Sequence, residues 1–156
     1  MAGFKDFREI AAWQLAHQMK LRVDVFLCCP DFRKHFKFCE QLSAAARSGP
    51  GKIAEGHGRF THKEFAQLVR IARGSEAQVL NHLVDAHDER LISADELTIN
   101  ERLAKRAMRA AGGLIRYLES TPDPPPGSSE AVKNPTADPI NPHRLGSCHP
   151  DRSVRK

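Results

Sequence analysis

The chain has 156 residues and a formal net charge of +5, with 28% charged and only 6% aromatic residues. This length favours a single folded domain, and no apolar run approaches the roughly 18 residues that a membrane-spanning helix requires. The N-terminal residues carry acids without a continuous apolar core, and the four cysteines show no disulfide framework. We therefore expect a cytoplasmic protein with no secretory leader, no membrane partner and no cofactor.

Apolar residues recur at alternating three- and four-residue steps in four segments, which is the spacing of amphipathic helices. The first helix is predicted from about residue 5 to 28 and the second from about 35 to 55. Thr61 and Ser93 each open a Ser/Thr-x-x-Glu capping box, which predicts the starts of a third and a fourth helix. Short connections between long helices predict an all-α fold, an antiparallel up-down-up-down four-helix bundle.

The most unusual stretch of the sequence runs from Ser48 to Arg59 and contains one proline and four glycines. A proline inside a helix removes a backbone hydrogen bond and costs about 3 kcal/mol, so Pro50 predicts a kink. Gly56 and Gly58 predict the end of the helix. The restart at the Thr61 cap then gives a helical hairpin with a basic turn, which we call the elbow (residues 56–61). The residues predicted to build this motif are Pro50, Glu55, Gly56, Gly58, Thr61 and Glu64.

Small residues occupy many of the apolar stripe positions. They let helix backbones approach closely, but they also limit the apolar area that one subunit can bury, at about 25 cal/mol per Å². Burying a second face in an oligomer would offset this loss. The small stripe residues are Ala45, Ala46, Gly49, Ala72, Ser75, Ala107, Ala110 and Ala111.

The last 36 residues have a different composition. Residues 121–156 contain eight of the ten prolines, with Gly, Ser and Asn between them, and their apolar residues are few and scattered. Such a segment buries too little apolar surface to offset the entropy lost on ordering. We therefore predict a folded unit over residues 1–120 and a disordered Pro-rich tail over residues 121–156.

Several motifs resemble a bacterial four-helix bundle family whose members are often encoded by intervening sequences within 23S ribosomal RNA genes. The resemblance covers about residues 4–119 in the family's order and spacing. The motifs that carry it are Phe7-Arg8-Glu9-Ile10, Trp13-Gln14, Ala16-His17, Ile53-Ala54-Glu55-Gly56-x-Gly58-Arg59, Lys63-Glu64-Phe65 and Ile71-Ala72-Arg73-Gly74-Ser75. The chain departs from the family at Gly49 and Gly51, where Ile or Val and Ala are usual, and at His57, where an aromatic residue is usual.

The resemblance implies a pentameric ring of four-helix bundles with no known enzymatic activity. A structural relative of the family, the accessory variability protein of diversity-generating retroelements, forms a similar pentamer that binds nucleic acid and a reverse transcriptase. The resemblance therefore predicts a non-enzymatic homopentamer. Its candidate partners are RNA or DNA and a protein such as a reverse transcriptase.

The distribution of charge points to nucleic acid independently of the resemblance. Residues 33–73 hold nine basic residues against three acids, a local excess of six positive charges. Clustered cations neutralise phosphates and release counterions. The elbow offers no series of aromatic platforms, so we expect binding without sequence-specific readout of single strands. The predicted nucleic-acid-binding residues are Arg47, Lys52, Arg59, Lys63, Arg70 and Arg73.

The charge pattern changes sign further along the chain. Residues 74–101 hold seven acids against Arg90, and the fourth predicted helix then carries five basic residues without an intervening acid. The alternative to a second basic surface is that these basic residues pair with the acids of the third helix, which would contribute little to stability. They are Arg102, Lys105, Arg106, Arg109 and Arg116.

The sequence gives little support for a metal site or a catalytic site. His35 and Cys39 lie four residues apart on one predicted helix face, but the Cys-x-x-Cys pairs typical of zinc sites are absent, and we predict no metal site. Glu55 and an exposed His57 could form an acid–base pair and Cys39 a nucleophile, but the sequence supplies no third orienting group, so we predict no enzyme. Glu55 more plausibly bonds backbone donors or Arg59. Two functions remain open: an oligomeric scaffold that binds nucleic acid, and a protein-interaction module with no nucleic-acid role.

Overall fold

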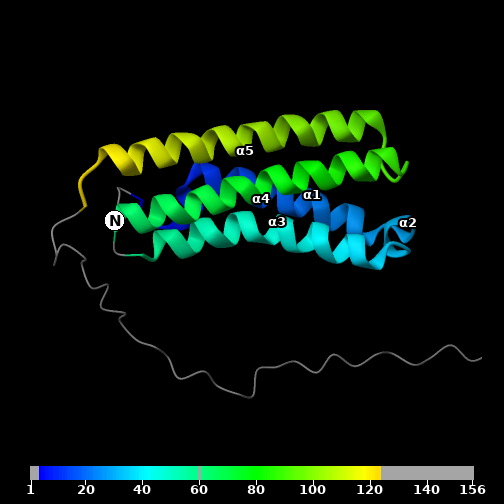
Figure 1. Ribbon diagram of the computed structural model, residues 1–156, viewed down its shortest axis with the longest axis horizontal. Coiled ribbons are helices and arrows are strands. Elements are labelled where there is room, and N and C mark those ends of the chain that lie inside the picture. Colours follow the sequence, from blue (N-terminus) through cyan, green and yellow to red (C-terminus); the bar gives the residue numbers. More distant parts are fainter. Residues whose placement is uncertain (1–3, 60, 124–156) are drawn as a thin grey trace, which may run out of the picture.

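The computed structural model describes residues 4–59 and 61–123 (Figure 1). The described chain is all-helical and contains no strand. Figure 1 shows the four long helices lying side by side, with α1 packed against α3 and α5, and α4 packed against α3 and α5. The elements in chain order are η1 (Phe7–Glu9), α1 (Ala11–Cys28), α2 (Pro30–Arg33), α3 (Phe36–His57), α4 (His62–Asp88) and α5 (Ala94–Ser120). From residue 124 on, the predicted tail lies outside the described residues.

The predicted start of the first helix is wrong by about six residues. The Asp6 carboxylate accepts a hydrogen bond from the Arg8 N–H at 2.7 Å and thereby caps the short 3-10 turn η1. Ile10 then adopts an extended backbone, with φ −77° and ψ 118°, so α1 cannot begin before Ala11. Pro30 stops α1 as predicted, but it also opens the unpredicted helix α2, since proline is well suited to a first helical position.

The predicted caps are confirmed at Thr61 and Ser93, but only Ser93 forms the full reciprocal capping box. The Thr61 hydroxyl accepts from the Glu64 N–H at 3.2 Å at the start of α4. At the start of α5, the Ser93 hydroxyl accepts from the Glu96 N–H at 3.2 Å and the Glu96 carboxylate accepts from the Ser93 N–H at 2.8 Å. These local bonds satisfy N–H groups that have no partner within their helix.

Pro50 lies inside α3, which continues on both sides of it. Two glycines of α3 are required by close packing. A Cβ on Gly49 would collide with the Glu76 carboxylate, and a Cβ on Gly56 would collide with the Phe65 ring. Gly49 and Gly56 therefore let α4 approach closely.

The apolar core has two clusters along the bundle. The cluster at the α2 end holds Met19, Val23, Phe26, Phe32, Leu42, Val79 and Leu83. The cluster at the elbow end holds Ile10, Ile53, Phe65, Val69, Leu114, Ile115 and Leu118. Fully burying one such side chain contributes about 1.5–3 kcal/mol, so these residues fix the helix packing that positions the surface residues below. Among the described residues, no helix is long and apolar enough to cross a membrane.

Candidate nucleic-acid interface

The elbow places a carboxylate between two of the predicted phosphate-binding residues. Glu55, in the last turns of α3, accepts from the Lys52 Nζ at 2.8 Å and from the Arg59 Nη2 at 2.6 Å. The hydrogen bond from Lys52, with a second from Arg59, lowers the pKa of Glu55 below its ordinary value. Glu55 therefore bonds Arg59, as the sequence predicted, and neutralises part of the charge at the elbow.

Three of the six predicted cations gather around one hollow beside the elbow. The hollow has a volume of about 610 Å³. Arg70 pairs across the helices with Glu119 of α5, while Lys63 makes no ion pair within the part of the chain that the structure describes. The residues that line the hollow are Arg59, Lys63, Glu64, Gln67, Leu68, Arg70 and Glu119. The structure thus brings cations from the elbow and α4 together with two acids.

The remaining two predicted cations stand apart from this hollow. Arg47 and Arg73 are exposed, and neither forms an ion pair among the described residues. They flank the point where α3 and α4 touch through the Ser48 and Ser75 hydroxyls, which are hydrogen bonded at 2.8 Å. The predicted surface is therefore two groups of cations, one at the elbow and one near the middle of α3 and α4.

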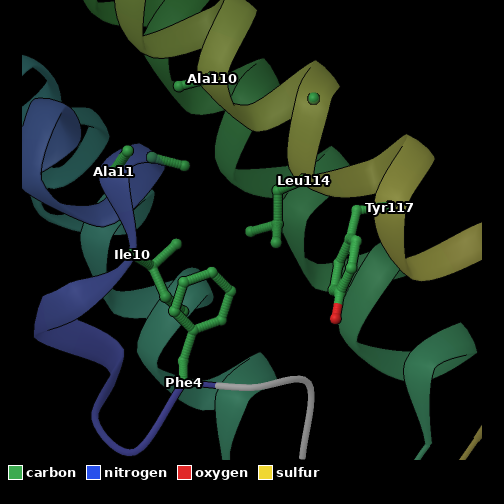
Figure 2. A pocket seen from close by; sticks show the side chains of 8 residues that line it. Phe4, Ile10, Ala11, Ala110, Leu114 and Tyr117 are labelled. Carbon is green, nitrogen blue, oxygen red and sulfur yellow. The ribbon is translucent and has the colours of Figure 1, made fainter. Parts of the chain in front are cut away.

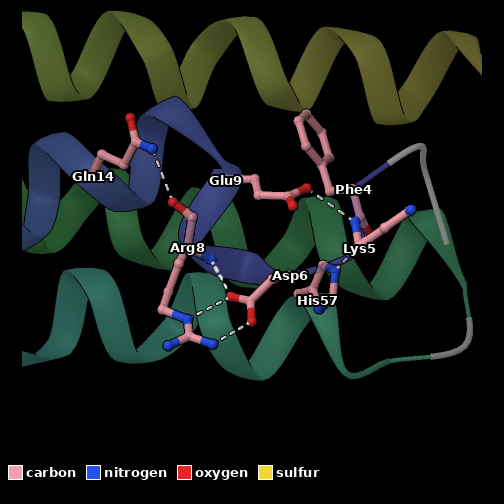
Figure 3. A network of polar contacts seen from close by, with 7 residues as sticks. All are labelled: Phe4, Lys5, Asp6, Arg8, Glu9, Gln14 and His57. Atoms are coloured by element: carbon pink, nitrogen blue, oxygen red, sulfur yellow. Dashed lines mark hydrogen bonds and ion pairs between the residues drawn. The ribbon is translucent and has the colours of Figure 1, made fainter. Parts of the chain in front are cut away.

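His57 is not the exposed residue that the sequence predicted. Its side chain is half-buried, and its Nε2 lies 3.1 Å from the Phe4 carbonyl oxygen (Figure 3). Its ring also packs edge-on against Phe7 and Phe65. Glu55 and His57 have different partners, so the structure does not join them as an acid–base pair. Instead, His57 attaches the N-terminal segment to the elbow.

The polar network of Figure 3 fixes the rest of that segment. The Arg8 guanidinium bonds both oxygens of Asp6, at 2.9 and 2.7 Å, and its side-chain hydrogen bond lowers the pKa of Asp6 to about 2. The Gln14 amide donates to the Arg8 carbonyl at 2.9 Å. These contacts order the segment without any residue of α4 or α5.

The residues that follow α5 contact the start of α4, next to the elbow. The Asp123 carboxylate accepts from the His62 N–H at 2.5 Å, at the start of α4, and the Thr121 carbonyl accepts from the His62 Nδ1 at 2.9 Å. The His62 side chain is only 5% exposed. Nothing in the sequence pattern signals this contact, because the partners are about sixty residues apart. It places a carboxylate at the positive end of the α4 dipole, where negative charge is stabilising.

The basic residues of α5 do not pair with the acids of α4. Lys105 pairs within its own helix with Glu101 at 2.6 Å, and the one ion pair between the two helices in the described chain joins Arg70 of α4 to Glu119 of α5. The other four basic residues of α5 are exposed and form no ion pair with described residues. They are Arg102, Arg106, Arg109 and Arg116. The predicted site did not include this second set of free cations.

The residues considered for metal binding have other contacts. His35 Nδ1 lies 3.4 Å from a Glu89 oxygen, and the Cys39 thiol donates to the Phe32 carbonyl at 2.9 Å. Burial raises the pKa of the Cys39 thiol, which disfavours the nucleophilic thiolate. Within residues 4–59 and 61–123, no group of three His, Cys, Asp or Glu side chains is placed to hold a metal ion.

One acid that the sequence placed among surface charges is buried. Glu76 of α4 is 2% exposed, and neither carboxylate oxygen has a hydrogen-bond partner. It points at Gly49 of α3, and burial raises its pKa to about 8. Glu76 therefore adds no negative charge to the surface, so residues 74–101 present six surface acids rather than seven.

Comparison with known families matches residues 8–112 to the family described as 23S rRNA-intervening sequence protein. The matched range begins in η1 and ends within α5, so it contains all six predicted nucleic-acid-binding residues. A comparison with curated proteins found no match.

Proposed function

The chain belongs to the 23S rRNA-intervening sequence protein family, and we propose that it is a non-enzymatic, cytoplasmic scaffold that self-assembles, as a pentamer, and holds RNA or DNA. The nucleic acid would lie on the basic surface of α3, the elbow and α4. Within each subunit the four long helices would run up-down-up-down, since only short connections separate consecutive helices. Such a scaffold would serve a protein partner such as a reverse transcriptase.

The observation that carries the nucleic-acid proposal is the hollow at the elbow. Arg59, Lys63 and Arg70 line it from two elements, and Lys63 is free of any described carboxylate. Arg47 and Arg73 extend the positive surface toward the middle of the bundle. Phosphate groups could replace Glu55 and Glu119 as partners of the arginines, because a polyanion offers many charges in a row. Since no aromatic side chain of the described residues lines the hollow, the expected binding is to the backbone and not to the bases.

Self-assembly is supported by the small residues of the helix stripes and by the opposed charge of two helices. Ala45, Ala46 and Ala72 are buried in place of larger side chains, so one subunit buries little apolar area for its length. Exposed acids at the α2 end of α4 would attract Arg109 and Arg116 of α5 between neighbouring subunits in a head-to-tail ring.

A protein-interaction module without a nucleic-acid role is the second candidate. The observation in its favour is that Lys52, Arg59 and Arg70 each already contact a carboxylate of the same chain. Cations that are neutralised in this way release fewer counterions when a polyanion binds, so the elbow would bind nucleic acid less well than its sequence suggests.

The two candidates are separated by the salt dependence of binding to a fluorescent RNA and to a DNA of unrelated sequence. Replacing Lys52, Arg59 and Lys63 together by Gln should weaken both complexes by similar factors. It should also flatten the plot of log K against log salt by about 0.7–0.9 for each lost phosphate contact. The matched control replaces Arg33, Lys34 and Lys37 by Gln at the opposite end of α3.

A smaller loss in the control than in the elbow variant supports the proposed surface. Equal losses in the two variants would mean that the overall field of the protein, and not the elbow, attracts the polyanion. Absence of binding by the wild-type protein at low salt would leave the protein-interaction module as the function.

A further inference from the structure

Two hollows follow one another along α1 and α5 and together form a groove, and no elbow residue lines either hollow. Its first part is an apolar hollow of about 420 Å³ next to the N-terminal segment (Figure 2). Figure 2 shows side chains from both helices and from that segment around it, including Phe4, Ile10, Ala11, Ala110, Leu114 and Tyr117.

The second part of the groove is a hollow of about 460 Å³ further along the same two helices. It combines arginines with exposed apolar side chains. Its lining includes Gln18, Leu21, Arg22, Ile99, Arg102 and Arg106. We call the first part the apolar hollow, the second the arginine hollow, and the two together the α1–α5 groove.

The α5 side of the groove has the spacing of a helix-packing seam. Six α5 residues that line one hollow or the other follow one another at steps of four, three, four, three and four: Ile99, Leu103, Arg106, Ala110, Gly113 and Tyr117. Steps of this kind keep one line of side chains facing a neighbouring helix. The line spans 19 residues, from Ile99 to Tyr117, or about 27 Å at 1.5 Å per residue, so it could receive a helix of about five turns.

Gly113 leaves the floor of the apolar hollow open. A Cβ at Gly113 would have only the end of the Arg116 side chain near it, at 4.0 Å, so no part of the described chain requires glycine there. Glycine inside a helix costs about 1 kcal/mol relative to alanine. Gly51 and Gly74 are equally open, but they line none of these hollows. At Gly113 the missing side chain makes room for the close approach of another backbone.

Exposed apolar side chains concentrate on these two helices. Of seven exposed large apolar residues in the described chain, four lie on α1 and α5: Leu21, Val25, Ile99 and Tyr117. The other three lie on α3 and α4. Of these, Ile71 and Val84 are thirteen residues apart and thus about 220° apart around α4, so they form no stripe. No other described face of the chain offers a comparable apolar line.

The arginines of the groove favour an acidic occupant. Asn100, fully buried in α5, accepts from the Arg22 Nε at 2.6 Å and orients that guanidinium, while Arg102 and Arg106 form no ion pair with described residues. The nearest acids of the same helices are taken by lysines, Asp24 by Lys20 and Glu101 by Lys105. Three arginines therefore face the groove without a carboxylate partner.

We propose that the α1–α5 groove docks an amphipathic helix of a partner protein. Its apolar side chains lie over Gly113 and the apolar hollow, and its carboxylates bond Arg22, Arg102 and Arg106. A second copy of this chain fits less well, because outside α1 and α5 the described chain exposes only three large apolar side chains, and Ile71 and Val84 form no stripe with one another. Nucleic acid also fits less well, because phosphates would leave Leu21, Ile99 and Tyr117 uncovered.

The test uses a synthetic 21-residue helical peptide with Leu at seam positions and three Glu near one end. A mate peptide carries Lys in place of each Glu. Fluorescence anisotropy with the full-length protein in 150 mM salt should show the Glu peptide binding about tenfold tighter than the Lys peptide. The double variant Arg102→Glu/Arg106→Glu should reverse this preference. The matched control, Arg47→Glu/Arg73→Glu, has the same charge change outside the groove and should keep it.

Gly113→Leu tests the apolar hollow separately. It should weaken binding of the Glu peptide about tenfold while leaving the helical signal and thermal midpoint intact or raised, since leucine is the better helix former. An unchanged affinity in Gly113→Leu, or an unchanged preference in Arg102→Glu/Arg106→Glu, overturns the proposal. It is also overturned if Gly113→Leu dissociates an oligomer of the wild-type protein, because a second copy would then occupy the groove. Loss of RNA binding in Arg102→Glu/Arg106→Glu without peptide binding by the wild type would assign the arginines to nucleic acid instead.

Discussion

Glu55 of α3 and Glu76 of the neighbouring α4 show how the pKa of one kind of side chain differs between two regions of the bundle. Glu55 lies at the exposed elbow, where two cations bond it and lower its pKa. Glu76 lies in the middle of the bundle, 2% exposed and without a hydrogen-bond partner, where burial raises its pKa to about 8. At the elbow the carboxylate neutralises part of the positive charge of the surface. In the interior the free energy of unfolding depends on whether the carboxyl is protonated.

The largest expected effect is the pH dependence that Glu76 gives to folding. A carboxyl whose pKa is about 8 when folded and 4.5 when unfolded stabilises the native state most below pH 4.5. Stability should fall as pH rises from 4.5 through 8, by about 1.4 kcal/mol per unit and about 5 kcal/mol in total. Urea unfolding at several pH values would measure it.

The control for this effect is Glu76→Leu, which removes the titrating group while keeping the volume. Its stability should vary little between pH 5 and 8 and should exceed that of the wild type at pH 8. If the free energies of unfolding of wild type and variant differ by the same amount at every pH, the carboxyl of Glu76 is not the titrating group.

The packing of Glu76 against Gly49 can be tested by a substitution on α3. A methyl group at Gly49→Ala would meet the buried Glu76 carboxylate, and we expect a loss of about 1–3 kcal/mol. The double variant Gly49→Ala/Glu76→Ala should lose less than the sum of its two single variants, because the collision is then absent. Additive losses in thermal or urea unfolding would contradict this contact. Gly51→Ala, with nothing near its Cβ, is the matched control.

The contact of Asp123 with α4 predicts two different truncation phenotypes. Deleting residues 124–156 should leave the thermal midpoint nearly unchanged, because this segment has few apolar residues that could pack against the bundle. Deleting residues 121–156 also removes the acceptors of His62 and should cost about 1 kcal/mol, or about 4 °C. Equal midpoints for the two truncations, measured by circular dichroism, would show that this contact adds nothing to stability.

The smallest effect on stability is expected at Glu55. Glu55→Gln removes two exposed ion pairs, so the midpoint should barely move, but it frees Lys52 and Arg59. If the elbow binds nucleic acid, affinity for RNA at low salt should then rise several-fold and the salt dependence should steepen. Glu40→Gln, an exposed acid of α3 away from the elbow, is the control with the same charge change. An equal rise in both variants would assign the effect to net charge.

Much of the fold could be predicted from the sequence because its signals are local. The caps at Thr61 and Ser93 act within four residues, and the bonds of Glu55 to Lys52 and Arg59 lie within one turn. The start of α1 was missed because the extended backbone at Ile10 follows from the Asp6 cap and not from apolar spacing.

The candidate site was less predictable because its charges are decided by distant partners. Arg70 pairs with Glu119 and His62 bonds Asp123, about fifty and sixty residues away, and no local pattern indicates either contact. Glu76 did carry a signal, since it lies four residues after Ala72 and three before Val79 on the apolar stripe. A charged residue on such a stripe would ordinarily be expected at its edge, and only the packing of Gly49 shows that it is inside.

Both ends of the described chain are held at the elbow, since Phe4 bonds His57 on one side of the turn and Asp123 bonds His62 on the other. Figure 1 shows the start of the described chain and the end of α5 at this same end of the bundle. A segment joined directly before Phe4 or directly after Asp123 is therefore tethered within a short radius of the hollow lined by Arg59, Lys63 and Arg70. Tethering of this kind gives a covalently attached group a millimolar effective concentration, so even a weakly acidic fusion would compete with an external polyanion for the elbow.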